Sequence, residues 1–98
     1  PAKYIIHTVC PRYVYGTSEE EKLLALAYRS ALSLKDKATD ASSIAFVSLG
    51  TGVYRWPLEV AAKIAVAELN KSAFDKTMMC VADEMARAIY NNAFRESL

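Results

Sequence analysis

The sequence is poor in the residues that build metal centres and disulfide frameworks. Its 98 residues include two cysteines and one histidine. A single histidine excludes a His-rich metal site, and there is no C-x-x-C spacing. Cys10 and Cys80 lie far apart in apolar runs, which is typical of small buried hydrophobic residues in a reduced protein; one disulfide between them is the alternative. We predict reduced cysteines, and neither a metal nor another cofactor.

Strong charge of one sign and long apolar runs are also missing. The 12 basic and 11 acidic residues are scattered along the chain and leave a net charge of +1. No basic block indicates nucleic acid, and no apolar stretch approaches the roughly 20 residues that span a bilayer. The composition, 53% hydrophobic and 23% charged, is ordinary for a packed globular protein, and the length allows one domain at most. We therefore expect no nucleic-acid partner and no membrane partner.

Apolar segments rich in β-forming residues alternate with amphipathic segments. Strands are predicted at 3–10, 43–48 and 77–82. Each is followed by a segment with helical periodicity, which gives the order β-α-β-α-β-α. That order predicts an α/β fold, a three-layer α/β/α sandwich with a mostly parallel sheet and right-handed crossovers.

Each predicted helix has a recognisable start. Thr17 with Glu20, or Ser18 with Glu21, has the spacing of a capping box. Pro57 fits the first turn of the second helix, and Asp83 is placed to cap the third. The buried stripe of the second helix is predicted at Leu58, Ala61, Ala62, Ala65, Val66 and Leu69. The shared face of the third is predicted at Met85, Ala88, Ile89 and Ala93.

A glycine loop, Gly50-Thr51-Gly52, follows the second predicted strand and precedes the second helix. Strand, glycine loop and helix form a layout that exposes backbone N–H groups to a phosphate. A tight turn is the alternative for such a short motif. Tyr54 and Trp56 are placed to flank a sugar or a base, although Trp56 equally fits a role in covering the helix start. The loop is the strongest candidate anion site.

Other polar residues make no catalytic case from their spacing. His7 lies within an apolar run, where one local hydrogen bond normally satisfies a histidine. Cys10 falls at the carboxyl end of the first predicted strand, but no base adjoins it in sequence. Asp83 and Glu84 follow the third strand and are explained as a helix cap and a first-turn charge. Paired carboxylates, a metal-ligand set and a catalytic triad are all absent from the pattern.

With these segments placed, the chain resembles a macro domain, the family that binds ADP-ribose and in many members hydrolyses its esters or glycosidic linkages. Residues 4–11 read Y-I-I-H-T-V-C-P, which is similar to the family's V-I-H-x-V-G-P strand. Residues 43–46 read S-I-A-F, and 51–57 read T-G-V-Y-R-W-P, similar to its S-I-A-F-P…S-T-G-[VI]-[YF]-G-Y-P strand and diphosphate loop. The resemblance covers nearly all of the chain but only about the C-terminal half of the family domain.

The resemblance implies a ligand site at the glycine loop. Residues expected to contact the diphosphate and distal ribose of ADP-ribose are Gly50, Thr51, Gly52, Val53 and Tyr54. The early segments that carry the adenine-contacting Asp, the Asn-rich segment and the first glycine loop have no counterpart here, so the catalytic residues are left unknown. Residues 1–98 are accordingly expected to be the C-terminal portion of a single macro-like domain. An abrupt start at Pro1 agrees with that expectation.

Four positions depart from the family pattern within the matching half. Cys10 stands where glycine is usual, Gly50 where serine is common, and Arg55 where glycine is common. Ala82 stands where many members place an aromatic residue that stacks on adenine. Arg55 either adds a charge-assisted phosphate contact or crowds the ribose pocket.

Three functional hypotheses follow. The first is recognition of ADP-ribose or an ADP-ribosylated protein, with the intact domain either a binding module or, if active, an ADP-ribosyl hydrolase or O-acetyl-ADP-ribose deacetylase in the cytoplasm or nucleus. The second is a half-domain without catalysis that pairs its open sheet edge with a partner or with itself, because three buried-type strands need further neighbours. The third, another nucleotide-phosphate hydrolase, lacks a Walker-type Lys-Ser/Thr motif. A complementary N-terminal segment or self-association is the expected protein contact.

Overall fold

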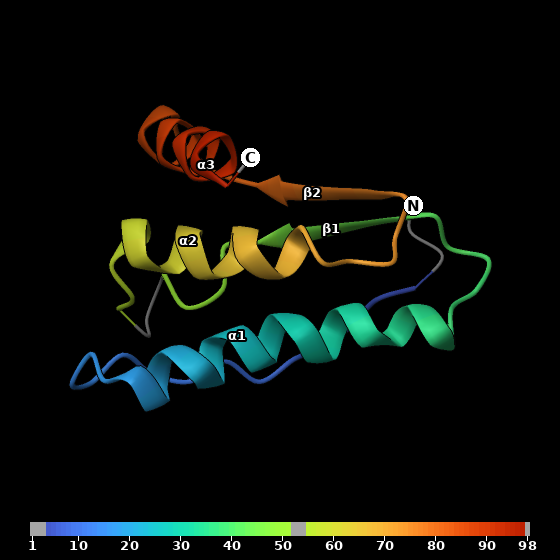
Figure 1. Ribbon diagram of the computed structural model, residues 1–98, viewed down its shortest axis with the longest axis horizontal. Helices are drawn as coiled ribbons and strands as arrows, with labels where there is room; N and C mark the ends of the chain where they lie inside the picture. Colours follow the sequence, from blue (N-terminus) through green and yellow to red (C-terminus); the bar gives the residue numbers. More distant parts are fainter. Residues whose placement is uncertain (1–3, 52–54, 98) are drawn as a thin grey trace.

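The computed structural model of the chain describes residues 4–51 and 55–97 and shows a parallel sheet with helices (Figure 1). Its elements are α1 (Ser18–Leu32), the 3-10 helix η1 (Ser33–Asp36), β1 (Ser43–Val47), α2 (Leu58–Leu69), β2 (Lys76–Cys80) and α3 (Glu84–Glu96). The two strands pair in parallel, with Ser43 opposite Lys76 and Val47 opposite Cys80. The α/β fold class is confirmed. No helix in the described ranges is long and apolar enough to cross a membrane.

The predicted helix starts are largely confirmed. The Thr17 side chain accepts a hydrogen bond from the Glu20 amide, and the Glu20 carboxylate accepts one from the Thr17 N–H, so the capping box is complete. Asp83 caps α3 by accepting from the Ala86 amide at 2.8 Å. Pro57 lies one residue earlier than predicted, because it is the N-cap of α2 rather than a member of its first turn.

The Glu20 carboxylate also organises the loop before α1. It accepts hydrogen bonds from the backbone N–H groups of Val14, Tyr15, Gly16 and Thr17. Desolvation alone would raise the pKa of this carboxyl, but the four amide donors outweigh it and lower the pKa below its usual range. One side chain therefore both caps the helix and holds the preceding turn.

The predicted first strand is wrong for the described part of residues 3–10. Residues 4–10 form no strand and run beside α1, where Thr8 Oγ1 donates to the Ala27 carbonyl at 3.2 Å. Burial alternates along the segment, with Ile5 81% and Val9 91% exposed. A strand needs a hydrogen-bonded neighbour, and no described strand pairs with this segment. The sequence pattern identified a segment rich in β-forming residues, but the described part of the chain supplies no strand that pairs with it.

The two strands of the sheet also bury only one face. Their exposure alternates in step, because residues opposite each other in the register point the same way. The covered face carries Ile44, Phe46, Thr77 and Met79. On the other face Val47 is 67% exposed and Met78 is 39% exposed. The described helices therefore leave an apolar sheet face open to solvent.

The core lies where α1, α2 and the covered sheet face meet. Leu24 and Tyr28 of α1 are fully buried, as are Ala61, Ala62 and Ala65 of α2. These alanines confirm the predicted stripe of α2, and small side chains let the helix approach its neighbours closely. Figure 1 shows α2 lying between α1 and α3, and α2 contacts both helices.

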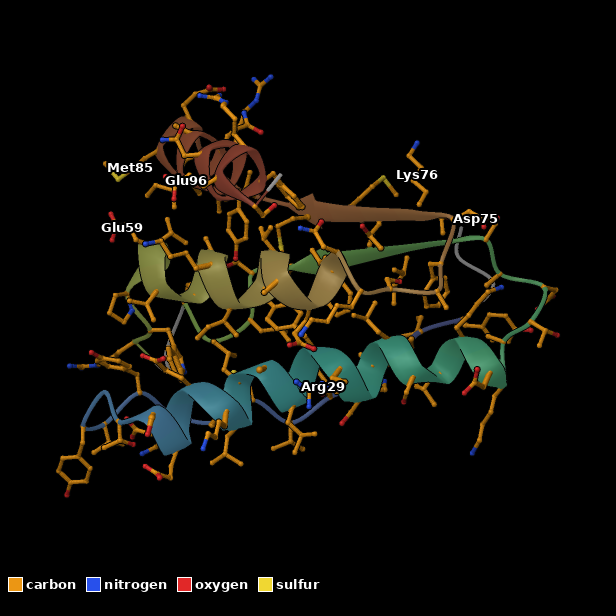
Figure 2. All side chains as sticks on the ribbon, viewed as in Figure 1. Arg29, Glu59, Asp75, Lys76, Met85 and Glu96 are labelled. Carbon is orange, nitrogen blue, oxygen red and sulfur yellow. The ribbon has the colours of Figure 1, made fainter. Side chains whose placement is uncertain are left out.

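Two positions on the predicted face of α3, Met85 and Ala88, are exposed. Met85 is 73% exposed, and Figure 2 shows its side chain pointing away from the body of the protein. Ala93 is buried as predicted, and Tyr90 is buried although it was not part of that face. Five residues separate Met85 from Tyr90, which places them about 140° apart around the helix. Because the Tyr90 hydroxyl has a partner inside the protein, burying this ring turns Met85 toward solvent.

A buried carboxylate links α1 to α2. Glu68 is 5% exposed and accepts from Arg29 Nε at 3.0 Å and from Arg29 Nη2 at 3.1 Å, while Lys71 Nζ lies 3.7 Å away. The Arg29 hydrogen bonds lower the pKa of Glu68 below its usual value of about 4.5, and burial opposes them. This fork-shaped contact joins two helices that are 39 residues apart in sequence.

Replacing Glu68 with glutamine is expected to lower the free energy of unfolding at pH 7 by about 1 kcal/mol, a modest loss because Arg29 remains solvated. The folded-state pKa is depressed, so the carboxylate stabilises the fold above pH 4.5 and loses that effect as the pH falls through the folded value. The difference between wild type and variant should therefore shrink below pH 4. Urea unfolding from pH 3 to 8 measures it. Glu84→Gln, which alters the exposed pair with Arg87, is the control and should show a much smaller change.

Candidate functional site

The glycine loop leaves the carboxyl end of β1 and leads to α2, as predicted. Of the five residues expected to contact ligand, Gly50 and Thr51 are described, and both are half-buried. Gly52, Val53 and Tyr54 lie outside the described residues. Thr51 Oγ1 donates to the Ser48 carbonyl at 3.2 Å, a local contact that closes the turn after β1.

Gly50 cannot be replaced without displacing its neighbours. Its φ of +82° falls in the left-handed region, where only glycine is free of strain. A Cβ atom here would overlap Cδ1 of Trp56 and lie 3.1 Å from Cys10 Sγ. The Gly50 carbonyl also accepts from the Trp56 amide at 2.9 Å. Although serine is common at this position in the family pattern, the packing of Trp56 here requires glycine.

Trp56 serves the fold at this site. Its ring is 3% exposed, its Nε1 donates to the Pro11 carbonyl at 2.9 Å, and Tyr13 packs against it with ring centroids 5.1 Å apart. Of the two roles left open by the sequence, covering the helix start agrees with this burial. The indole also connects the loop to residues 10–13.

A network of hydroxyl groups beneath the loop was not predicted from the sequence. Tyr28 Oη accepts from the Leu49 amide at 3.0 Å, and Ser48 Oγ is hydrogen-bonded to Tyr90 Oη. Burial raises the pKa of both tyrosines, with mutual interaction of their hydroxyls adding to the rise at Tyr28. Both rings are therefore neutral at physiological pH. No signal in the sequence pointed to Tyr90, which lies outside the face predicted for the third helix. Tyr28 has only the spacing of a core residue in its helix.

Cys10 adjoins the loop without the properties of a nucleophile. Its thiol is half-buried, contacts the Pro11 carbonyl at 3.5 Å, and has its pKa raised by burial. Reactive cysteines need the opposite shift, toward the thiolate. Cys10 and Cys80 are both free thiols in this structure, but Cys80, expected to be a small buried residue, is exposed.

Among the described residues, no side chain caps the backbone donors at the entry to α2. The N-cap Pro57 has no polar side chain and makes no capping hydrogen bond, in contrast to the N-cap residues of α1 and α3. Arg55 precedes it with a φ of +66°. A non-glycine residue in that region is strained, which explains why the family pattern commonly has glycine there. The first-turn amides Leu58, Glu59 and Val60 begin a helix whose positive dipole end follows the loop.

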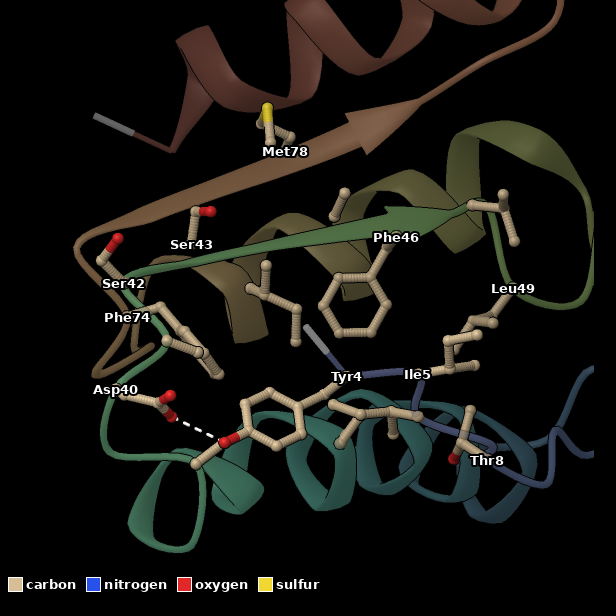
Figure 3. Close-up of a pocket in the computed structure, with 17 residues that line it drawn as sticks. Tyr4, Ile5, Thr8, Asp40, Ser42, Ser43, Phe46, Leu49, Phe74 and Met78 are labelled. Atoms are coloured by element: carbon tan, nitrogen blue, oxygen red, sulfur yellow. Dashed lines mark hydrogen bonds between the residues drawn. The ribbon is translucent and has the colours of Figure 1, made fainter. Parts of the chain in front are cut away.

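A separate groove of about 630 Å³ lies between residues 4–8 and β1 (Figure 3). Its lining is mostly apolar, and Asp40 is its one charged residue among those described, with its carboxylate accepting from Tyr4 Oη at 2.7 Å. Gly50 and Thr51 do not line it. In the described ranges no group of three or more His, Cys, Asp or Glu residues is placed to hold a metal ion. The groove therefore differs from the glycine loop in both position and chemistry.

Fold and loop together define an α/β protein with a glycine turn at the carboxyl edge of a parallel sheet. The family profile described as Macro domain matches residues 1–65, and the chain belongs to the macro domain family. A macro domain-containing protein of Mesorhizobium japonicum is 41% identical over 98 residues, which cover 95% of this chain and 55% of that protein. An ADP-ribose glycohydrolase of Xenopus laevis is 35% identical across 98% of this chain and 24% of its own length.

Solved structures give the same result. A mutant macrodomain of Oceanobacillus iheyensis, determined with ADPR, superposes with a TM-score of 0.83 at 33% identity, covering 93% of this chain and 50% of that one. The chain thus spans about half the length of the first relatives and solved domains that it matches.

Proposed function

We propose that this chain recognises ADP-ribose and supplies the loop that binds its diphosphate. The observation that carries the proposal is the placement of Gly50 and Thr51 between the carboxyl end of the parallel strand β1 and the start of α2. The solved relative with ADPR, 33% identical to this chain, supports the choice of ligand. Residues Gly52, Val53 and Tyr54 complete the proposed loop from the sequence motif.

The physical basis is backbone donors in neutral surroundings. A positive φ at Gly50 and an uncapped helix start both favour N–H groups that point toward an anion. Groups that pack against the described loop are uncharged at neutral pH, because burial raises the pKa values of Cys10, Tyr28 and Tyr90. A diphosphate would therefore meet amide dipoles there without repulsion from a buried anion.

For the intact domain we further propose hydrolysis of ADP-ribosyl or O-acetyl-ADP-ribose linkages. The name of the Xenopus laevis relative supports this class of reaction. The part assigned to this chain is to fix the diphosphate, which orients the distal ribose toward a water molecule and stabilises developing charge. No residue of this chain is assigned to proton transfer or to nucleophilic attack.

Calorimetric titration with ADP-ribose tests the recognition proposal. Wild type should bind saturably, and Gly52→Glu should abolish the heat, because a carboxylate in the loop repels the diphosphate. The charge-matched control is Ala67→Glu, which adds the same charge at an exposed position of α2 and should bind like wild type. Circular dichroism confirms that both variants fold. No heat with wild type at millimolar ligand, or equal loss in both variants, would contradict the proposal.

A further inference from the structure

We propose that Tyr28 is a positioning residue for the glycine loop, because its buried hydroxyl fixes, through one peptide unit, the orientation in which Thr51 meets the diphosphate. The inference rests on the proposed function, in which Thr51 is one of the residues assigned to the ligand. Tyr28 itself lies in α1, beneath the loop, and acts on the ligand only through Thr51.

One peptide unit connects the two side chains. Tyr28 Oη accepts from the Leu49 amide at 3.0 Å, and Thr51 Oγ1 donates to the Ser48 carbonyl at 3.2 Å. That N–H and that C=O belong to the same peptide bond, the one between Ser48 and Leu49. Because a peptide unit is planar, turning its N–H also turns its C=O. The Tyr28 hydroxyl therefore sets the direction of the carbonyl that holds the Thr51 side chain.

The Tyr28 end of this connection is held firmly. Its side chain is fully buried, and its ring packs against Phe46 of β1 with ring centroids 5.1 Å apart. Burial, with a further contribution from the Tyr90 hydroxyl, raises the pKa of Tyr28, so the group stays a neutral phenol at physiological pH. A buried acceptor on a packed ring restricts the peptide that it bonds more than water would.

The Leu49 amide depends on this acceptor. It falls between the end of β1 and the start of α2, and in the described ranges no backbone carbonyl accepts from it. Without the Tyr28 hydroxyl, the amide would turn toward water and carry the Ser48 carbonyl with it. Thr51 would then lose its fixed orientation, and ordering the loop again on binding would lower the affinity for the diphosphate.

A purely structural role for the Tyr28 hydroxyl has different consequences. Its removal would then lower the stability of the fold, but the dissociation constant of the molecules that remain folded would not change. A positioning role raises that dissociation constant, and it does so only while Thr51 keeps its hydroxyl. A double-mutant cycle on ligand binding therefore separates the two roles.

The cycle uses calorimetric titration with ADP-ribose at a temperature where circular dichroism shows each protein folded. Its members are wild type, Tyr28→Phe, Thr51→Val and the double variant. Tyr28→Phe should weaken binding about five- to tenfold, the size of one hydrogen bond. In the Thr51→Val background the same substitution should weaken binding less than about twofold. Ala31→Gly loosens α1 at a buried position without removing a hydrogen bond to the loop and should bind like wild type.

Hydrogen exchange of the wild-type chain gives a second measurement, which does not depend on the folding of a variant. Coupling between two sites is reciprocal, so a ligand that needs the Tyr28 contact must also strengthen it. Saturating ADP-ribose should therefore slow exchange at the Leu49 amide by a larger factor than at the Asn70 amide, which bonds the Val66 carbonyl at the far end of α2.

Three outcomes would overturn the inference. The first is unchanged affinity in Tyr28→Phe, and the second is an equal loss from that substitution with and without the Thr51 hydroxyl. The third is slowing at the Leu49 amide no greater than at the Asn70 amide. In all three the wild type still binds, so recognition of ADP-ribose stands. A wild type that does not bind ADP-ribose would overturn both proposals, and the wild-type titration alone tells that case apart.

Discussion

Replacing Gly50 with alanine is expected to lower the free energy of unfolding by about 2–5 kcal/mol. The left-handed backbone costs an L-residue roughly 1–2 kcal/mol. Overlap of the new Cβ with the buried Trp56 ring adds about 1–3 kcal/mol, because the indole is held by Pro11 and cannot withdraw. Since native domains are stable by only about 5–15 kcal/mol, much of the native stability would be lost.

Urea unfolding followed by tryptophan fluorescence measures this effect directly, since Trp56 is the only tryptophan. Gly16→Ala is a matched control with the same sign of φ, +69°. There the new Cβ would press on the hydroxyl end of the half-buried Tyr13 ring, a long side chain that can rotate away. The control should therefore lose mainly the backbone term, roughly 1–2 kcal/mol. Equal losses in the two variants would refute the role assigned to Trp56.

Tyr28→Phe is expected to cost about 1–3 kcal/mol, the next largest effect. Without the hydroxyl, the Leu49 amide loses its acceptor inside the protein, directly before the glycine loop. Ring packing is retained, including the contact with Phe46 at a centroid distance of 5.1 Å, so the loss reports the hydrogen bond. We also expect faster hydrogen exchange at the Leu49 amide.

Tyr90→Phe is the comparison for that variant. Its hydroxyl bonds the Ser48 side chain, which can rotate to another partner, so its removal should cost about 1 kcal/mol and leave exchange at Leu49 nearly unchanged. A larger loss for Tyr90→Phe than for Tyr28→Phe would show that the hydroxyl network, rather than the Leu49 amide, is what Tyr28 supports.

The sequence predicted what depends on local chemistry. The Thr17 and Asp83 caps, the alanine stripe of α2 and the parallel pairing of β1 with β2 all follow from nearby residues or from chain order. The prediction of a strand at 3–10 was wrong because an apolar pattern indicates only that a segment is suited to a sheet. Whether it pairs depends on which other strands are present. Met85 was misplaced because one hydrogen bond at Tyr90 fixed the rotation of α3.

The position of the candidate site in the chain could be predicted from the sequence, but the packing around it could not. Strand, glycine and helix start could be read from the order of residues, and the family resemblance named the ligand. What required the structure was tertiary: the overlap that excludes a side chain at Gly50, the burial of Trp56, and the Tyr28 acceptor for Leu49. Two of these, the contact of Trp56 with Pro11 and that of Tyr28 with Leu49, join residues far apart in the chain, where periodicity gives no information.

The central claim is that the loop after β1 binds the diphosphate of ADP-ribose. Its most direct test is an amide chemical-shift titration of the isotope-labelled chain with ADP-ribose. We predict saturable shifts at Gly50, Thr51 and the first turn of α2, reproduced by ADP and absent with adenosine. Shifts confined to residues that line the groove between 4–8 and β1, equal shifts with adenosine, or no saturable shift at the loop would contradict it.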